Sequence, residues 1–216
     1  MVSPPVTVCL LKKNYKHSHS GLVDAEHLEK NWQHVDFKKL GEDYINNLKS
    51  FFGNKRYFVD KLPLNVLLSG AILRALPNAR IICLLRNPLD TVIGNYRQNF
   101  EQTSGTYAYS LNLESLANFV REFRHLVSNL QQAFPDQFKV IHYEELVSDP
   151  IKCSKDMFSF CGLSWQDEYV NIHKNTSPIG TASAAQVKEP IHKNSLGNSE
   201  KYMSFLFPLQ KKFLQT

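Results

Sequence analysis

The 216-residue sequence lacks several patterns that would place it at once in a functional class. It has no G-x-x-x-x-G-K-[ST] phosphate loop, which argues against a nucleotide kinase. No window offers the roughly 18 consecutive apolar residues of a membrane span. The apolar run at the N-terminus precedes the first lysines, the reverse of a secretory signal. These absences predict a soluble, cytoplasmic protein with no membrane partner.

Strong charge and paired cysteines are also missing. Lys and Arg number 25 against 20 Asp and Glu, an excess that favours anionic ligands. No run of five like charges and no stripe of interleaved basic and aromatic residues occurs, so a nucleic-acid partner is not expected. The four cysteines, Cys9, Cys83, Cys153 and Cys161, are widely spaced without a C-x-x-C pair. They are predicted to be buried free thiols, and no metal site is predicted.

Strands and helices alternate through most of the chain. The periodicity predicts helices near residues 36–53, 64–76, 87–99, 113–134, 150–161 and 199–214, and strands near 56–59, 80–85 and 138–143. Residues 1–35 show only a short β-like run at Val6–Leu11 and are predicted to form an irregular arm. The prediction is therefore an α/β domain at 36–216 with a parallel sheet flanked by helices.

One strand end carries the first candidate for a binding site. The apolar stretch Arg80–Leu85 stops at Arg86, and a helix follows with Asn87 as N-cap and Pro88 at its first position. In open α/β sheets, ligands lie beyond the carboxyl ends of strands. Arg86 and the amides at the start of the helix are expected to converge on an anion there. An ordinary ion pair between Arg86 and Asp90 remains the alternative.

Several motifs, taken in order, resemble those of one protein family. "VDKLPLN", "LPNARIICLLRNPLDTVIGNYRQNF", "VIHYEELVSDP" and "TASAAQVKEPI" resemble the sulfotransferase family over about residues 36–205, and most closely its bacterial and tyrosylprotein branch. The resemblance implies a P-loop-like fold and 3'-phosphoadenosine-5'-phosphosulfate (PAPS) as sulfuryl donor, with adenosine 3',5'-bisphosphate as its product. It implies an acceptor with a hydroxyl group, on a tyrosine, a carbohydrate or a small metabolite.

The same resemblance suggests roles for individual residues. Lys61 would contact the donor sulfate and stabilise the leaving phosphate, and Arg86 would bind the 3'-phosphate. Tyr143 would lie against the nucleotide, while Ser183 and Gln186 belong to a loop that closes over the donor, with Ser183 near the reacting oxygen. Without the resemblance, Lys61 reads as a solvated lysine, Tyr143 as a half-buried strand end and "TASAAQV" as a small-residue loop.

The sequence departs from the family pattern at the donor site. The glycine-rich loop that would follow the first strand is absent, and no residue can be assigned as the catalytic base. Gly94 stands where the family has a serine that binds the 3'-phosphate. Asn198 replaces a basic residue expected to help Arg86, and Lys193 or Lys201 could substitute only after a rearrangement.

Two functional interpretations follow. The chain is either a PAPS-dependent sulfotransferase or an inactive, truncated sulfotransferase-like protein that serves as a binding module or is a gene fragment. The first strand of the sheet is expected to be missing or replaced by Val6–Leu11. A missing strand would expose apolar neighbours and favour self-association.

Overall fold

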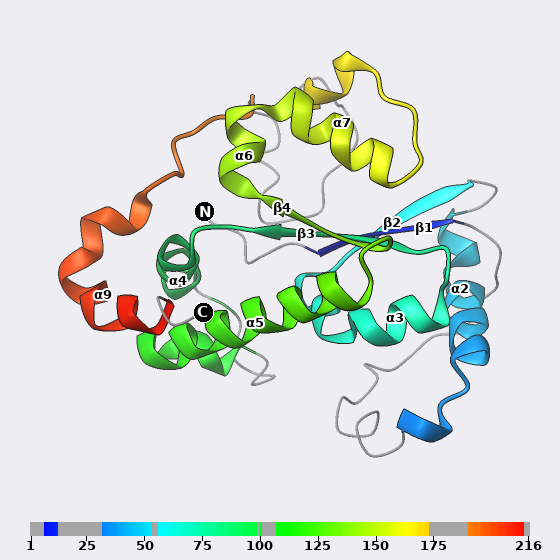
Figure 1. Ribbon diagram of the computed structural model, residues 1–216, viewed down its shortest axis with the longest axis horizontal. Helices are drawn as coiled ribbons and strands as arrows, with labels where there is room; N and C mark the ends of the chain where they lie inside the picture. The colour runs from blue at the N-terminus through cyan, green and yellow to red at the C-terminus, as the bar shows by residue number, and fades with distance from the viewer. Residues whose placement is uncertain are drawn as a thin grey trace. The chain divides into compact units, whose positions relative to one another are not determined.

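The computed structural model describes residues 7–12, 32–52, 56–98, 100, 107–172 and 190–213 (Figure 1). The strands in these ranges are β1 (Thr7–Lys12), β2 (Tyr57–Lys61), β3 (Arg80–Leu85) and β4 (Phe138–His142). The α-helices are α2 (Phe37–Phe52), α3 (Ser69–Ala75), α4 (Pro88–Tyr96), α5 (Leu113–Ala133), α6 (Tyr143–Ser148), α7 (Pro150–Phe160) and α9 (Met203–Gln210). Short 3₁₀ helices include Pro63–Leu68, before α3, and Asn198–Tyr202, before α9. The predicted α/β class is confirmed.

The described residues form two compact units. One contains residues 84–129 and 140–216, and the other contains residues 7–83 and 130–139. In the first unit, apolar side chains of α4, α5 and α9 pack together: Leu89, Val92, Ile93, Leu116, Ala117, Val120, Leu206 and Leu209. In the second unit, the buried side chains include Ile45, Phe58, Val66, Leu73, Ile81 and Phe138. The division into an arm at 1–35 and a domain at 36–216 stays a prediction.

The sheet has the strand order β2-β1-β3-β4. Strand β1 is antiparallel to both neighbours, with Val8 opposite Lys61 and Thr7 opposite Cys83. β2 and β3 therefore share one direction. The Ile81 amide at the start of β3 donates to the Gln137 carbonyl just before β4 at 2.7 Å, so β4 runs the same way.

The apolar run of the N-terminal region thus forms a strand of the sheet, next to β3. The prediction of a parallel sheet is wrong at β1, which runs against its neighbours. Its short apolar run indicates a strand but not a direction, because parallel and antiparallel ladders both pair the backbone.

Close packing joins the two helices of the second unit. A Cβ atom placed on Gly41 of α2 would lie 2.9 Å from the carbonyl carbon of Ala75, the last residue of α3, and closer still to its oxygen. Only a glycine lets the two backbones approach this closely.

Further sequence predictions can be compared with the described residues. Cys83 and Cys153 are buried, as expected, whereas Cys161 is only partly buried. In the part of the chain that the structure covers, no helix is both long enough and apolar enough to cross a bilayer.

Candidate functional site

The candidate site lies at the carboxyl end of β3, in the unit that contains α4. The side-chain oxygen of Asn87 accepts hydrogen bonds from the amides of Leu89 at 3.0 Å and Asp90 at 3.1 Å. Pro88 occupies the first helical position, where no amide hydrogen is needed. The predicted strand end and N-cap are therefore confirmed, and Arg86 is placed at the junction between β3 and α4.

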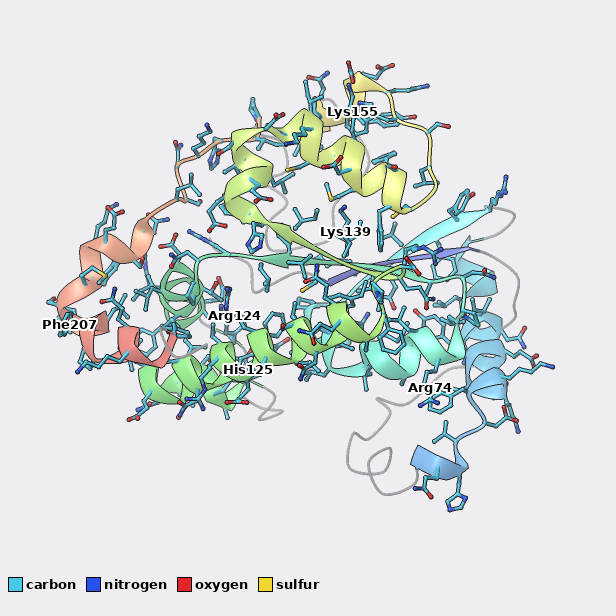
Figure 2. The ribbon with its side chains drawn as sticks, in the orientation of Figure 1. Arg74, Arg124, His125, Lys139, Lys155 and Phe207 are labelled. Atoms are coloured by element: carbon cyan, nitrogen blue, oxygen red, sulfur yellow. The ribbon has the colours of Figure 1, made fainter. Side chains whose placement is uncertain are left out.

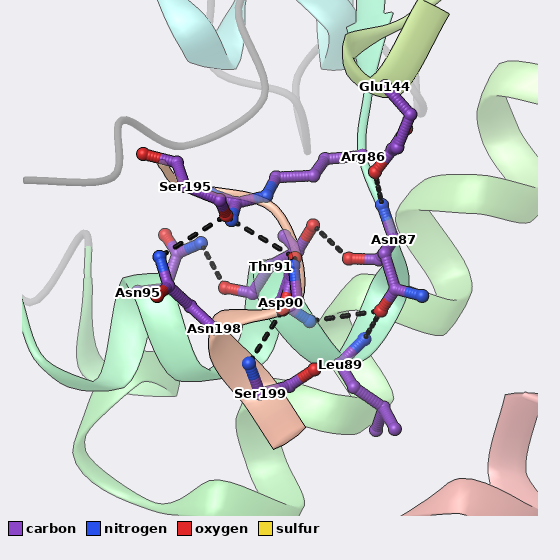
Figure 3. A network of polar contacts seen from close by, with 11 residues as sticks. Arg86, Asn87, Leu89, Asp90, Thr91, Asn95, Glu144, Ser195, Asn198 and Ser199 are labelled. Atoms are coloured by element: carbon purple, nitrogen blue, oxygen red, sulfur yellow. Dashed lines mark hydrogen bonds and ion pairs between the residues drawn. The ribbon is translucent and has the colours of Figure 1, made fainter. Parts of the chain in front are cut away.

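Arg86 is almost buried and is held on several sides (Figure 3). Its Nη2 atom forms an ion pair with Asp90 at 3.1 Å and donates a hydrogen bond to the carbonyl of Ser195. The Arg86 Cζ atom lies 5.1 Å from the ring centroid of Tyr143, within the range of a cation–π interaction. The ion pair with Asp90, the alternative that the sequence left open, is thus present, and it accounts for one end of the guanidinium.

A second nitrogen of the Arg86 guanidinium, Nε, is not accounted for. Nε is buried and has no hydrogen-bond partner among the described residues. Leaving a buried donor unsatisfied costs about 1–3 kcal/mol, and more for a charged group. Such an atom needs an explanation, and an acceptor supplied by a ligand is one.

Asp90, which forms the ion pair with Arg86, is itself buried. The Asp90 side chain is 2 % exposed, and its carboxylate also accepts hydrogen bonds from the amides of Gly197 at 3.0 Å and Ser199 at 2.7 Å. These residues belong to a turn more than 100 positions later in the sequence. One carboxylate therefore joins the end of β3, the first turn of α4 and the residues before α9 (Figure 3).

The start of α4 differs from the expectation that its amides are open to an anion. The amides of Leu89 and Asp90 bond to the Asn87 side chain, and the Thr91 amide bonds to the Asn87 carbonyl at 2.9 Å. The amide of Asn87 donates to Glu144 Oε1 at 2.7 Å. This part of the prediction is wrong, because the helix already satisfies its first donors, and anion binding here would rest on side chains.

A second arginine reaches the same strand end. Nη1 of Arg124, on α5, donates to the carbonyl of Arg86 at 3.3 Å, and Figure 2 labels this side chain. Among the described residues, no ion pair between Arg124 and a carboxylate is present. Sequence reasoning missed this residue because it used α5 only for its apolar stripe; a basic residue on the polar side of a long helix carries no signal of its own.

The remaining predicted site residues fall in different places. Tyr143 is beside Arg86, as described. Gly94 is buried in α4, in the same unit, and Lys61 is an exposed residue at the end of β2 in the other unit. Ser183 and Gln186 lie outside the described residues.

Asn198, which stands where the family has a basic residue, lies next to the Arg86 site. The Asn198 side-chain nitrogen donates to the Ser195 carbonyl at 3.2 Å, the same oxygen that Arg86 contacts. Asn198 therefore supports the turn that holds Arg86. Lys193 and Lys201, the residues that might have compensated, are both exposed.

These features define an α/β protein with a partly engaged arginine at the end of a strand, the kind of place where such folds bind anionic ligands. The sulfotransferase family matches residues 9–167, and the chain belongs to this family. The match includes Lys61, Arg86 and Tyr143 and ends before the turn that bonds to Asp90.

Two curated relatives are similar to the chain, and one of them carries a sulfotransferase name. An uncharacterized protein from Aquifex aeolicus is 30 % identical over 172 residues, which are 80 % of this chain and 23 % of that protein. A carbohydrate sulfotransferase 1 from Danio rerio is 27 % identical over 182 residues, which are 79 % of this chain and 38 % of that protein. The chain therefore spans less than two fifths of the length of either relative.

Proposed function

We propose that this protein transfers a sulfuryl group from PAPS to a hydroxyl group and binds the 3'-phosphate of the donor through Arg86. Family membership supports the class of reaction. The buried Nε atom of Arg86, which has no partner among the described residues, is the observation that carries the proposed binding site. A phosphate oxygen would supply the acceptor that this donor needs, and the planar guanidinium suits bidentate recognition of phosphate.

The other predicted site residues would have separate roles in the transfer of the sulfuryl group. The donor supplies a sulfuryl group: the acceptor oxygen bonds to sulfur while the bond from sulfur to the phosphate oxygen breaks, and the hydroxyl proton is released. Lys61 would stabilise the negative charge that develops on the phosphate. Tyr143 would support Arg86 and the nucleotide, Ser183 would contribute a hydrogen bond near the reacting oxygen, and Gln186 would bind the donor from the loop that closes over it.

Binding of adenosine 3',5'-bisphosphate, measured by calorimetry, tests the donor site directly. Arg86→Lys is the sharpest variant, because a lysine keeps a positive charge beside Asp90 but lacks the Nε donor of the planar fork. Arg121→Lys is the matched control, since Arg121 lies in the same unit but its exposed guanidinium pairs with Glu122.

The proposal expects saturable binding by the wild-type protein that weakens about tenfold or more in Arg86→Lys, in line with about 1.5–3 kcal/mol for a charge-assisted hydrogen bond. Arg121→Lys should bind like the wild type. Absence of binding at millimolar nucleotide, or equal affinity in all three proteins, would refute the proposed role of Arg86.

For the acceptor, we propose a carbohydrate hydroxyl. The support is the curated relative named as a carbohydrate sulfotransferase. Transfer of radiolabelled sulfate from PAPS to a panel of oligosaccharides, a tyrosine peptide and small phenols would test this choice. Labelling of the peptide or phenols but not of the sugars would overturn it.

A second candidate function is a non-catalytic anion-binding module. The observation in its favour is that Asp90 already neutralises Arg86 and Asn87 already caps α4, so part of the expected anion site is used internally. The two candidates differ in turnover. Wild-type protein that binds adenosine 3',5'-bisphosphate but transfers no sulfate, and whose binding is unchanged in Lys61→Ala, would establish the module.

A further inference from the structure

Asp90 is placed to organise the candidate site without touching a ligand itself. Its carboxylate is buried and accepts from Arg86 Nη2 at 3.1 Å, the Gly197 amide at 3.0 Å and the Ser199 amide at 2.7 Å. A buried carboxylate is costly unless it is paired and hydrogen-bonded. Here three donors from two distant parts of the chain satisfy it, so their positions depend on one another.

The backbone of the turn is shaped to present two amides to this carboxylate. Gly197 has φ of +65°, a left-handed conformation that L residues with a side chain rarely adopt. A Cβ atom at Gly197 would lie 2.9 Å from Oε1 of Glu200. The same residue precedes the 3₁₀ helix Asn198–Tyr202, so its conformation aims the amides of Gly197 and Ser199 together.

The Ser195–Ser199 turn also holds Arg86 in place. The Ser195 carbonyl accepts hydrogen bonds from Arg86 Nη2 and from the Asn198 side chain. With Nη2 engaged by Asp90 and Ser195, the planar guanidinium has little freedom to rotate, and its Nε edge is kept in one orientation. The Tyr143 ring restricts the same group from another direction.

We propose that Asp90 is the positioning residue of the phosphate site: it fixes the Ser195–Ser199 turn and the Nη2 end of Arg86, so that Nε is presented to the 3'-phosphate of the donor. This inference rests on the proposed function, because it concerns how the same arginine recognises the donor. It gives a buried carboxylate and a turn beyond the family match a role in selecting nucleotides that carry a 3'-phosphate.

The test compares two ligands that differ only in that phosphate. Dissociation constants for adenosine 3',5'-bisphosphate and for adenosine 5'-monophosphate are measured for the wild type, Asp90→Asn, Asp90→Glu and Gly197→Ala. The ratio of the two constants reports recognition of the 3'-phosphate, whereas general damage to the fold weakens both ligands alike. A thermal melt of each variant shows that it is folded under the conditions of the titration.

The proposal expects the wild type to prefer the bisphosphate and Asp90→Asn to lose about tenfold or more of that preference, with little change in affinity for the monophosphate. Asp90→Glu, which restores the charge, should recover part of the preference. Gly197→Ala leaves Arg86 and Asp90 in place but strains the turn, so it should lower the preference too. If Asp90→Asn does not fold, the change in preference of Gly197→Ala decides the test.

The outcomes separate the inference from the proposed function. A wild-type protein without preference for the 3'-phosphate would overturn both. A wild-type preference that survives in Asp90→Asn, or in Gly197→Ala where Asp90→Asn fails to fold, would overturn the positioning role and leave the proposed function intact. Parallel weakening of both nucleotides in the folded variants would show that Asp90 acts only on the fold.

Discussion

The contact between α2 and α3 allows a prediction in which two similar substitutions have opposite signs. Gly41 and Gly70 lie in helices of the same compact unit. Replacing glycine by alanine inside a helix normally stabilises it by up to about 1 kcal/mol. A Cβ atom at Gly70 would meet nothing within 4 Å, so Gly70→Ala should raise the free energy of unfolding by about 0.5 kcal/mol or more.

At Gly41 the steric clash should outweigh the gain in helix propensity. The added Cβ atom would lie 2.9 Å from the Ala75 carbonyl carbon and 3.2 Å from Leu76 Cδ2. The nearest group is backbone, which cannot rotate aside as a flexible side chain would, so α2 and α3 must separate. Overpacking of this kind costs about 1–3 kcal/mol, and a clash with backbone should lie at the upper end, so subtracting about 1 kcal/mol for helix propensity leaves a net loss of about 2 kcal/mol.

Urea unfolding followed by circular dichroism measures both effects in one assay. The midpoint should fall for Gly41→Ala and rise for Gly70→Ala, with unchanged slopes. A Gly41→Ala protein as stable as the wild type would refute the close approach of the two helices. Destabilisation by Gly70→Ala would show that the space around α3 is not open as described.

Three further predictions concern the unit that carries the candidate site. Asn87→Ala should lower the free energy of unfolding by about 1 kcal/mol, because the amides of Leu89 and Asp90 lose their cap; urea unfolding measures this, and an unchanged midpoint would contradict it. Tyr143→Leu should weaken adenosine 3',5'-bisphosphate binding severalfold in calorimetry, while Tyr143→Phe keeps the ring beneath Arg86 and most of the affinity; equal losses would remove the role of the ring. Burial, with a further contribution from Tyr107, raises the pKa of Tyr109 from 10.0 to about 12. The neutral phenol is therefore favoured in the folded state, and its contribution to stability is complete below pH 10 and declines as the pH rises toward about 12. Unfolding at about pH 9 and about pH 11 should differ less in Tyr109→Phe than in the wild type, and identical pH dependence would refute this.

The local features of the site could be predicted because they depend on neighbouring residues. The strand Arg80–Leu85 has the predicted bounds, and Asn87 is the N-cap that its position before Pro88 indicated. Even the ion pair between Arg86 and Asp90 could be proposed as an alternative, because Asp90 lies only four residues past Arg86, in the first turn of the helix that follows. Short-range geometry is encoded in adjacent residues and can be read without knowledge of the fold.

Long-range features could not be predicted in the same way. Nothing in the apolar run at the N-terminus indicates that β1 runs antiparallel to β2 and β3. Nothing in the sequence around Gly197 indicates that its amide meets Asp90, because backbone amides are present at almost every residue and carry no sequence signal. Arg124 was missed for a related reason: its contact is with a backbone carbonyl, that of Arg86.

The bond between Asp90 and Ser199 also affects where this protein can be divided. The family match ends at residue 167, which would be a natural place to end a shortened protein for expression. Such a protein would retain Asp90 but lose the two amides of Gly197 and Ser199 that satisfy its buried carboxylate. It would also lose Leu206 and Leu209, which pack against α4 and α5. The smallest unit expected to fold with an intact arginine site therefore extends through α9, well past the boundary that family comparison alone would suggest.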